Sequence, residues 1–449
     1  MNFPLSSLAP RPRATAVALA TLAGSGYAAW KEIHYRSPFW MSDIWSYLAI
    51  AKGQTAEVVQ PFVSRQLGPL IVRGLDALLH INAHLGFEIE GAISLLVLVG
   101  VIFALAAKSR APWWMLVAIT VAPMLPDTAL GLVLPDLFYS ALLAILLVLL
   151  EREWWMAAAL WMLPLMVARE STSLTLLCLL VAAWRPLRLR GCLLAVASAA
   201  GGAAIVHHLT RLSPGNPQHL PASVYILLKI PWNTTQNLFG VQLWNNINVG
   251  CGPPVWQHAV KLGAIHSVGF CGVNPAYPRG TAMALLTEFG LLPLLTGFIL
   301  WERRKLKNLR AIHIAAPNPV PRTAGYRTML RFATLYGALC FLLGPLLGTG
   351  VSRLMGYGWP LFFVVLPVWL GESSWVRSRR AAWAVPLFLA LHLAISWIYW
   401  QNVYLPKILL GWGVAAVLLK LWSGAGKRGP EAGVPAVQEP RIGDTPAQA

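Results

Sequence analysis

The stretch "LPDLFYSALLAILLVLL", residues 134–150, is apolar over almost its whole length and carries one acid, Asp136, near its start. Apolar runs of about 20 residues cross a lipid bilayer as helices, and shorter runs can do so inside a bundle of helices. Arg152 lies just beyond the run. We therefore predict a membrane-spanning helix over 134–150, with a basic end on one side of the membrane and Asp136 on the other.

The composition of the whole chain agrees with this prediction. Hydrophobic residues make up 57% of the 449 residues and charged residues 12%, and the mean hydropathy is +0.60. Soluble globular domains carry about 25% charged residues. The net charge of +18 does not indicate a nucleic-acid partner, because most Lys and Arg fall in short clusters between apolar runs. Such clusters favour anionic lipid headgroups instead, so membrane lipids are the expected partners.

Hydropathy and the Lys/Arg bias predict an all-α polytopic membrane protein with about twelve transmembrane helices. The predicted spans are 14–30, 90–107, 112–125, 134–150, 154–168, 172–184, 191–208, 284–301, 332–349, 358–371, 381–399 and 404–421. Every second connection is basic, which places both termini in the cytoplasm. The basic clusters are Arg11 and Arg13; Lys108 and Arg110; Arg152; Arg185, Arg188 and Arg190; Arg303, Arg304, Lys305, Lys307 and Arg310; Arg377, Arg379 and Arg380; Lys420, Lys427 and Arg428.

The predicted membrane domain covers residues 1–422. The tail, 423–449, is rich in Gly, Pro, Glu and Gln and predicts a disordered cytoplasmic segment. The opposite, outer face receives two large segments, 31–89 and 209–283. Cys251 and Cys271 lie in the second of these, and they can pair if it faces an oxidising compartment.

The first outer segment predicts two amphipathic helices that lie on the membrane surface. Asp43 stands where an N-cap belongs, and Gly53 follows as a stop signal. Ser64 is expected to cap the second helix. The apolar stripe of that helix is Leu67, Leu70, Ile71, Leu75, Leu78 and Leu79.

Several polar residues of the outer face have both a structural and a functional interpretation. Asp43 is either a helix cap, a general base, or both. Arg169 and Glu170, in "ARES", either mark a polar turn between two spans or line a pocket, since ionisable groups at membrane depth face a cavity or each other. If they line a pocket, Arg169 binds either a phosphate or Glu170.

Asp136 and Arg353 have the same two interpretations. Asp136 follows Pro135, as Asp127 follows Pro126, and an acid after proline commonly caps a helix or starts a turn. Arg353 lies in "GVSRLMGYGWPLF". Either its side chain extends to the membrane interface, or its planar guanidinium binds phosphate oxygens.

A metal site is not supported by the spacing of the histidines. The pairs His207–His208 and His80/His84 lack a carboxylate or cysteine at a distance that would complete a ligand set. No cofactor is therefore assigned, and a divalent metal stays an open alternative that the ligand spacing does not support.

Four stretches resemble the GT-C superfamily of polytopic glycosyltransferases. The stretch "SDIWSYLAIAKGQTAEVVQPFVSRQLGPLI", residues 42–71, resembles the bacterial pattern of an Asp, Tyr-Leu-x-Ile-Ala, a spacer, Pro-Phe and Arg-x-Leu-x-Pro. "LPDLFYSALLAILLVLL" and "ARESTSLTLL" resemble the spans that follow, and "SRLMGYGWPLFF" resembles a late outer turn. In layout the resemblance covers about residues 14–370.

The resemblance implies an enzyme of the bacterial inner membrane that takes a sugar from a polyprenyl-phosphate donor to an acceptor of unknown identity, with inversion. Asp43 matches the essential acid of the first outer loop. Glu170 and Asp136 are further catalytic candidates. In many members that acid is paired with a second one, whereas Ser42 precedes Asp43 here, so no metal-bridged mechanism is expected.

The remaining site residues follow from the same resemblance. The arginines Arg65, Arg169 and Arg353 are expected to bind the donor phosphate. Tyr47 and Tyr357 are expected to contact the acceptor or the sugar.

Other functional classes remain open from the sequence. A membrane transporter or lipid flippase would be equally apolar, but no repeated halves or paired broken helices are visible. A ligase or polymerase of surface polysaccharide would also be a membrane enzyme with a large outer loop. A non-enzymatic membrane scaffold is the last alternative.

Overall fold

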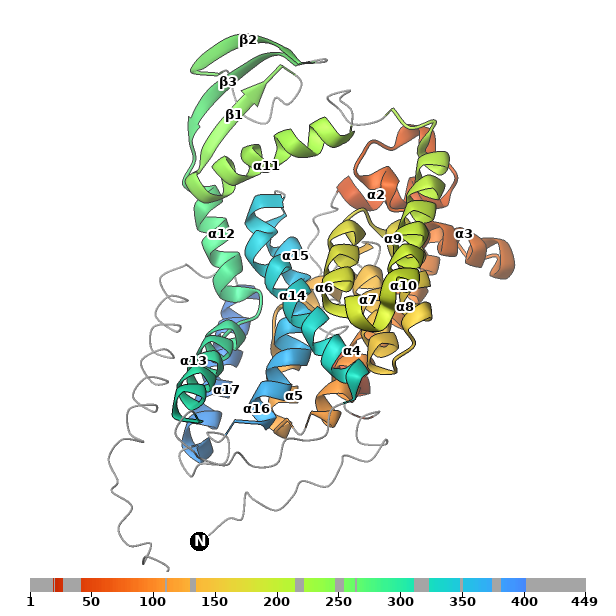
Figure 1. Ribbon diagram of the computed structural model, residues 1–449. Helices are drawn as coiled ribbons and strands as arrows, with labels where there is room; N and C mark the ends of the chain where they lie inside the picture. The colour runs from red at the N-terminus through yellow and green to blue at the C-terminus, as the bar shows by residue number, and fades with distance from the viewer. Residues whose placement is uncertain are drawn as a thin grey trace, which may run out of the picture.

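The computed structural model describes residues 19, 21–26, 42–109, 111–129, 135–214, 222–246, 254–262, 265–310, 323–347, 350–373 and 381–400. Over these residues the protein is mostly helical, with one small sheet at one end of a helical bundle (Figure 1). The predicted span 404–421, the tail 423–449 and most of the predicted span 14–30 lie outside the described residues.

The bundle contains helices of very different lengths. They are α2 (Ser42–Ala51), α3 (Leu67–Leu79), α4 (Ala83–Lys108), α5 (Trp113–Val121), α6 (Met124–Ala129), α7 (Pro135–Glu151), α8 (Trp155–Leu160), α9 (Met162–Ala168), α10 (Thr172–Thr210), α11 (Ala222–Phe239), α12 (Ala276–Thr287), α13 (Leu292–Arg310), α14 (Ala324–Leu347), α15 (Val351–Gly356), α16 (Leu366–Gly371) and α17 (Ala381–Trp400). Short 3-10 turns, η1 (Thr55–Glu57) and η2 (Phe62–Ser64), follow α2, and a π-helical turn, η3 (Pro360–Val365), joins α15 to α16.

Four helical segments within the described residues are long and apolar enough to cross a membrane. They are Ala83–Lys108, Thr172–Thr210, Ala324–Leu346 and Val351–Gly371. Trp155–Ala168 and Trp383–Ser396 are shorter apolar helices. By length and composition the chain is therefore compatible with a membrane protein, and the count of about twelve spans stays a prediction.

The apolar stretch that carries Asp136 forms α7, which lies at the centre of the bundle. Pro135 occupies its first turn, where no backbone N–H is needed, and Asp136 follows where the helix dipole favours an acid. Nearly every side chain from Pro135 to Leu150 is buried, and α7 packs against α4, α8, α9 and α14. Because the central helix begins at Asp136, this acid lies in the middle of one end of the bundle.

Helix α10 folds back on itself at Arg188, whose φ of 54° and ψ of 179° are not helical. A straight helix of 39 residues would separate its ends by about 57 Å. Glu170, just before the helix, and Thr210, at its end, nevertheless line the same pocket. The two halves thus correspond to the separate spans predicted at 172–184 and 191–208, with the basic cluster at the turn between them.

The predicted span 284–301 is interrupted, which corrects that part of the sequence analysis. α12 ends at Thr287 and α13 begins at Leu292. Between them Gly290 adopts a φ of +55°, and a Cβ there would collide with the ring of His392. The ring accepts a hydrogen bond from the backbone N–H of Leu291 at Nδ1 (3.0 Å), so Nε2 carries the proton that faces the Ala118 carbonyl at 2.8 Å.

The second outer segment contains a three-stranded antiparallel sheet, which the prediction of an all-α chain did not include. The strands β1 (Val241–Asn245), β2 (Trp256–Leu262) and β3 (Ile265–Val273) lie in the order β1-β3-β2. The strands are short, and the register shifts in both strand pairs. The alternation of apolar and polar residues that predicts a strand from sequence is therefore weak here. Cys271 in β3 is disulfide-bonded, and Cys251, its predicted partner, lies outside the described residues.

The first outer segment forms the two predicted helices, but neither predicted cap is present. α2 begins at Ser42, so Asp43 lies inside its first turn. Ser64 donates its hydroxyl to the Pro61 carbonyl at 2.5 Å, and α3 starts after Gln66 without a side-chain cap. The competing hydrogen bond within η2 explains why Ser64 does not cap the helix.

Helix α3 packs on α4 through small residues and leaves its large apolar residues exposed. Val72 is fully buried and contacts α4 where Gly86 leaves room. Leu70, Ile71, Leu78 and Leu79 are 37–75% exposed. Exposed leucines on one stripe are favourable where lipid is the solvent, as expected for a helix on the membrane surface.

The two ends of the bundle differ in their polar groups. At one end Lys108 and Glu151, the last residues of α4 and α7, form an ion pair of 2.9 Å, and Arg303 pairs with Glu372 at the same distance. Asp136, at the opposite end of α7, is linked through Arg353 to Asp43 of α2. Helix α2 lies toward the same end of the bundle as α11 and the sheet (Figure 1). Lys108 and Arg303 belong to the basic clusters predicted to face the cytoplasm, and Asp136 lies at the opposite end of α7; the orientation itself stays a prediction.

This topology predicts the labelling of three exposed positions. Cysteines introduced by Glu57→Cys and Gln257→Cys should react with a membrane-impermeant thiol reagent in intact cells, whereas Arg304→Cys should react only after permeabilisation. The native Cys178, Cys192 and Cys340 are buried, so the parent chain provides the background control. Labelling of Arg304→Cys and Glu57→Cys from the same side would overturn the orientation.

Candidate functional site

The eight residues singled out in the sequence gather in two hydrogen-bonded networks that adjoin at Arg169 and Glu170. They come from α2, the segment after η2, the start of α7, the turn between α9 and α10, and α15 with the residue that follows it. The eight residues are Asp43, Tyr47, Arg65, Asp136, Arg169, Glu170, Arg353 and Tyr357.

The first network surrounds the buried carboxylate of Asp136. Its Oδ1 accepts a hydrogen bond from the Tyr357 hydroxyl (2.5 Å) and one from Nη1 of Arg169 (2.6 Å). Its Oδ2 accepts one from Nη2 of Arg353 (2.6 Å). The guanidinium of Arg169 also contacts the Tyr357 hydroxyl and lies over the ring, 4.6 Å from the centroid. Three donors on one acid make Asp136 an anchor for both arginines.

Arg353 links this buried network to the first outer segment. Its second arm, Nη1, donates to Oδ2 of Asp43 at 3.0 Å, so one guanidinium joins α2 to α7. The side chains of Arg353 and Asp43 are 25% and 18% exposed, against 9% for Asp136. The Asp43–Arg353 pair is therefore the more open side of the first network.

The second network is centred on Arg65. Its Nη2 and Nε donate to the two oxygens of Glu170 at 2.8 and 3.2 Å, and its Nη1 donates to the Tyr47 hydroxyl at 2.8 Å. The hydroxyl of Ser64, whose proton is directed to the Pro61 carbonyl at 2.5 Å, lies 3.3 Å from Oε2 of the same carboxylate. A bidentate pair of this kind fixes the relative position of the first outer segment and the turn after α9.

The electrostatics of Glu170 keep its carboxylate ionised. Desolvation, the largest single effect, raises its pKa, but the charges of Arg65 and Arg169 and the hydrogen bonds to the carboxylate together lower it by more, so the pKa falls from 4.5 to about 2. Because the folded-state pKa is lower than the usual value, the pair stabilises the fold above pH 4.5 and is lost as the pH falls through about 2. Near neutral pH Glu170 is thus a hydrogen-bond acceptor and a weak base.

A second layer holds the two networks in place. The backbone N–H of Gln66 donates to the Val167 carbonyl at 3.0 Å, which ties the first outer segment to α9. Tyr139, one turn after Asp136 on α7, packs its ring edgewise on Tyr357 (5.5 Å between centroids) and bonds Thr175 through its hydroxyl (2.7 Å). The role of Tyr139 was not predicted, although the one-turn spacing of Asp136 and Tyr139 on a helix was a usable signal.

The geometry decides between several of the structural and functional interpretations. Asp43 is not an N-cap, and Arg353 lies within α15 and pairs with two acids instead of extending alone to the interface. Arg169 and Glu170 form the turn between α9 and α10, and Arg169 pairs with Asp136 and Glu170 with Arg65 in place of the predicted Arg169–Glu170 contact. Phosphate binding by Arg169 stays a prediction. The side chain of Asp127 lies outside the described residues.

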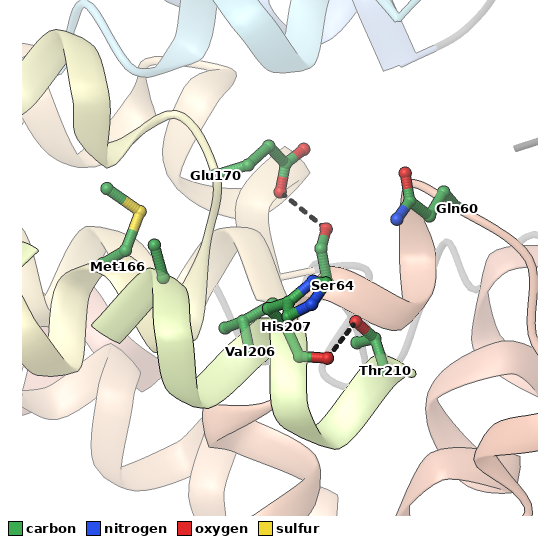
Figure 2. Close-up of a pocket in the computed structure, with 8 residues that line it drawn as sticks. Gln60, Ser64, Met166, Glu170, Val206, His207 and Thr210 are labelled. Carbon is green, nitrogen blue, oxygen red and sulfur yellow. Dashed lines mark hydrogen bonds between the residues drawn. The ribbon is translucent and has the colours of Figure 1, made fainter. Parts of the chain in front are cut away.

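A pocket of about 210 Å³ adjoins the second network (Figure 2). It lies between α9, α10 and the segment from Gln60 to Ser64, and the carboxylate of Glu170 faces it. His207, dismissed above as a metal ligand, lines this pocket. Within the described residues no group of three or more His, Cys, Asp or Glu side chains could hold a metal ion.

Comparison with models of known protein families, with curated proteins and with solved structures found no match to this chain.

Proposed function

We propose that the protein is an integral membrane glycosyltransferase of the GT-C type. It would transfer a sugar from a polyprenyl-phosphate donor to an acceptor on the outer face, with inversion and with Asp43 as the general base. The proposal includes the architecture of about twelve spans expected for that superfamily and a place in the bacterial inner membrane. The observation that supports it is the partly exposed Asp43–Arg353 pair, an acid beside a guanidinium at the open side of a buried ionic network.

Asp43 is the best base among the three carboxylates. Asp136 accepts three hydrogen bonds and is buried. Glu170 is held by a bidentate arginine. Asp43 accepts only one hydrogen bond from the described residues, the one from Arg353. Its remaining lone pairs are thus available for the proton of an acceptor hydroxyl.

The charges of the networks suggest an order of binding. The three arginines are matched by three acids, so a donor phosphate must replace one carboxylate to reach a guanidinium. The contact between Arg353 and Asp43 is the longest of the ion pairs in the first network, and both side chains are partly exposed. A donor phosphate that accepts the hydrogen bond from Nη1 of Arg353 replaces Asp43 there, so Asp43 becomes free to act as the base.

The transfer step then follows with balanced atoms and charges. Asp43 accepts the proton of the acceptor hydroxyl as its oxygen forms a bond to the anomeric carbon. The bond between that carbon and the phosphate oxygen breaks, and polyprenyl phosphate leaves with the electron pair. Arg353 stabilises the charge that develops on the phosphate, and Asp136 keeps Arg353 and Arg169 oriented throughout.

A transporter or flippase is the second candidate, because buried ion pairs also occur in transport proteins. The position of the networks favours an enzyme. Transport sites lie near the middle of the bilayer, whereas Asp136 is in the first turn of α7, about 22 Å along the helix from Glu151. A polysaccharide ligase or polymerase would share the chemistry proposed here and would differ in its acceptor.

Donor binding tests the proposal. Arg353→Ala should weaken binding of a polyprenyl-phosphate sugar at least tenfold in purified protein, because a charge-assisted contact is lost. The matched control is Arg73→Ala, which removes an exposed arginine of α3 outside the two networks. Equal donor affinity of the two variants, or no donor binding by the parent protein, would contradict the assignment.

A further inference from the structure

The pocket beside Glu170 has two unlike walls. Met166 of α9 and Ala203 and Val206 of α10 form an apolar wall. Gln60, Ser64, Glu170, His207 and Thr210 provide polar groups, and the close-up shows Gln60 on the side away from Met166, with the Glu170 carboxylate and the Ser64 hydroxyl between them (Figure 2). A pocket with an apolar wall and converging polar groups is the usual form of a small-molecule site.

The polar groups of the pocket are mainly hydrogen-bond acceptors. Glu170 is ionised. The hydroxyl protons of Ser64 and Thr210 are directed to the Pro61 and His207 carbonyls, which leaves the lone pairs of the two oxygens available. No Lys or Arg is among the lining residues. The pocket therefore favours a ligand that donates hydrogen bonds, and it does not favour an anion.

The charge of Glu170 is already compensated. Its two carboxylate oxygens form the bidentate pair with Arg65, at 2.8 and 3.2 Å. A cationic ligand would have to compete with that arginine or lie beside it, whereas a hydroxyl can share a carboxylate oxygen. The fitting ligand is thus neutral and rich in hydroxyl groups.

We propose that this pocket binds the neutral, hydroxyl-rich ring of a sugar. Its volume of about 210 Å³ is below the range of about 300–1,000 Å³ typical of sites for drug-sized ligands, so it suits one ring. The apolar wall receives the C–H face of the ring, and Glu170, Ser64 and Gln60 bind its hydroxyls. Its role as the acceptor subsite rests on the proposed function, whereas sugar binding does not.

Direct binding to the purified full chain tests the inference. Saturation-transfer NMR with neutral methyl glycosides, glucosamine and glucuronate, in the absence of any lipid donor, should detect the neutral glycosides most strongly. Ala203→Trp fills the pocket and should weaken their binding at least tenfold. Ala204→Trp is the matched control, because it makes the same change at the next exposed position of α10, turned about 100° away.

Three results would overturn the inference. These are no binding of neutral glycosides, stronger binding of glucosamine or glucuronate, and equal effects of the two tryptophan variants. The test is separable from the proposed function because it needs no turnover. If the protein binds glycosides but transfers no sugar, sugar binding by the pocket is supported and the transferase proposal is refuted. If the protein transfers sugar and Ala203→Trp changes neither transfer nor glycoside binding, the transferase proposal is supported and the pocket proposal is refuted.

Discussion

Asp43→Asn should lower the rate of sugar transfer by about 10²–10⁴-fold, the typical cost of losing a general base. Asparagine is nearly isosteric and keeps an oxygen that can accept the hydrogen bond now made by Arg353 at 3.0 Å. The fold should therefore be retained. Donor binding should be equal to that of the parent protein or tighter, because the negative charge that competes with the phosphate for Arg353 is gone. Single-turnover transfer and equilibrium donor binding measure the two effects separately.

The control for this prediction is Asp76→Asn, which removes an exposed carboxylate from α3 on the same outer side. It should leave both transfer and binding unchanged. Transfer by Asp43→Asn within tenfold of the parent rate would show that the base is another group, and Glu170 and Asp136 are the two other carboxylates of the networks. Weaker donor binding would contradict the competition between Asp43 and the phosphate.

Asp136→Ala should destabilise the protein by about 3–5 kcal/mol, because it leaves buried positive charge without its partner. Arg169 is only 4% exposed and would lose its carboxylate, and Arg353 would keep only Asp43. Reversible denaturant unfolding in micelles measures the change. The control is Glu88→Ala, which removes the exposed partner of His84 and should cost less than about 1 kcal/mol.

A double variant separates charge from packing at this position. Asp136→Leu combined with Arg169→Met replaces the ion pair with apolar groups of similar size, a change that is often neutral or stabilising. The double variant should therefore be more stable than Asp136→Ala. If the free energy of unfolding of Asp136→Ala is within about 1 kcal/mol of the parent value, the first network does not stabilise this end of the bundle.

Hydropathy predicted those helices whose apolar runs are continuous. The stretch 134–150 forms α7 and 381–399 forms α17, because a run of apolar residues has no lower-energy conformation in lipid than a helix. The same reasoning failed at 284–301, because Gly290 and the distant His392 interrupt the run. It also missed the sheet at 241–273, since strands stabilised by their neighbours need no strong pattern of their own.

The residues of the two networks could be selected from the sequence, but their pairings could not. Ionisable residues in an apolar chain are few, so Asp136, Arg169 and Arg353 could be selected one by one. That Arg353 joins Asp43, 310 positions away, to Asp136 depends on which helices are neighbours, and spacing in the sequence contains no such information. The predicted caps failed for a related reason, since Arg353 binds Asp43 and Pro61 binds the hydroxyl of Ser64.

The central claim is that the outer-side networks break a sugar–phosphate bond, and turnover without an ion gradient tests it most directly. The purified protein is reconstituted in vesicles with a radiolabelled polyprenyl-phosphate sugar and a cell-envelope extract as the source of acceptor, with ion gradients abolished. The account predicts that label moves from the lipid donor to a second species and that Asp43→Asn stops the transfer. Label that stays on the donor lipid, together with substrate flux that appears only when a gradient is imposed, would contradict it and identify a transporter.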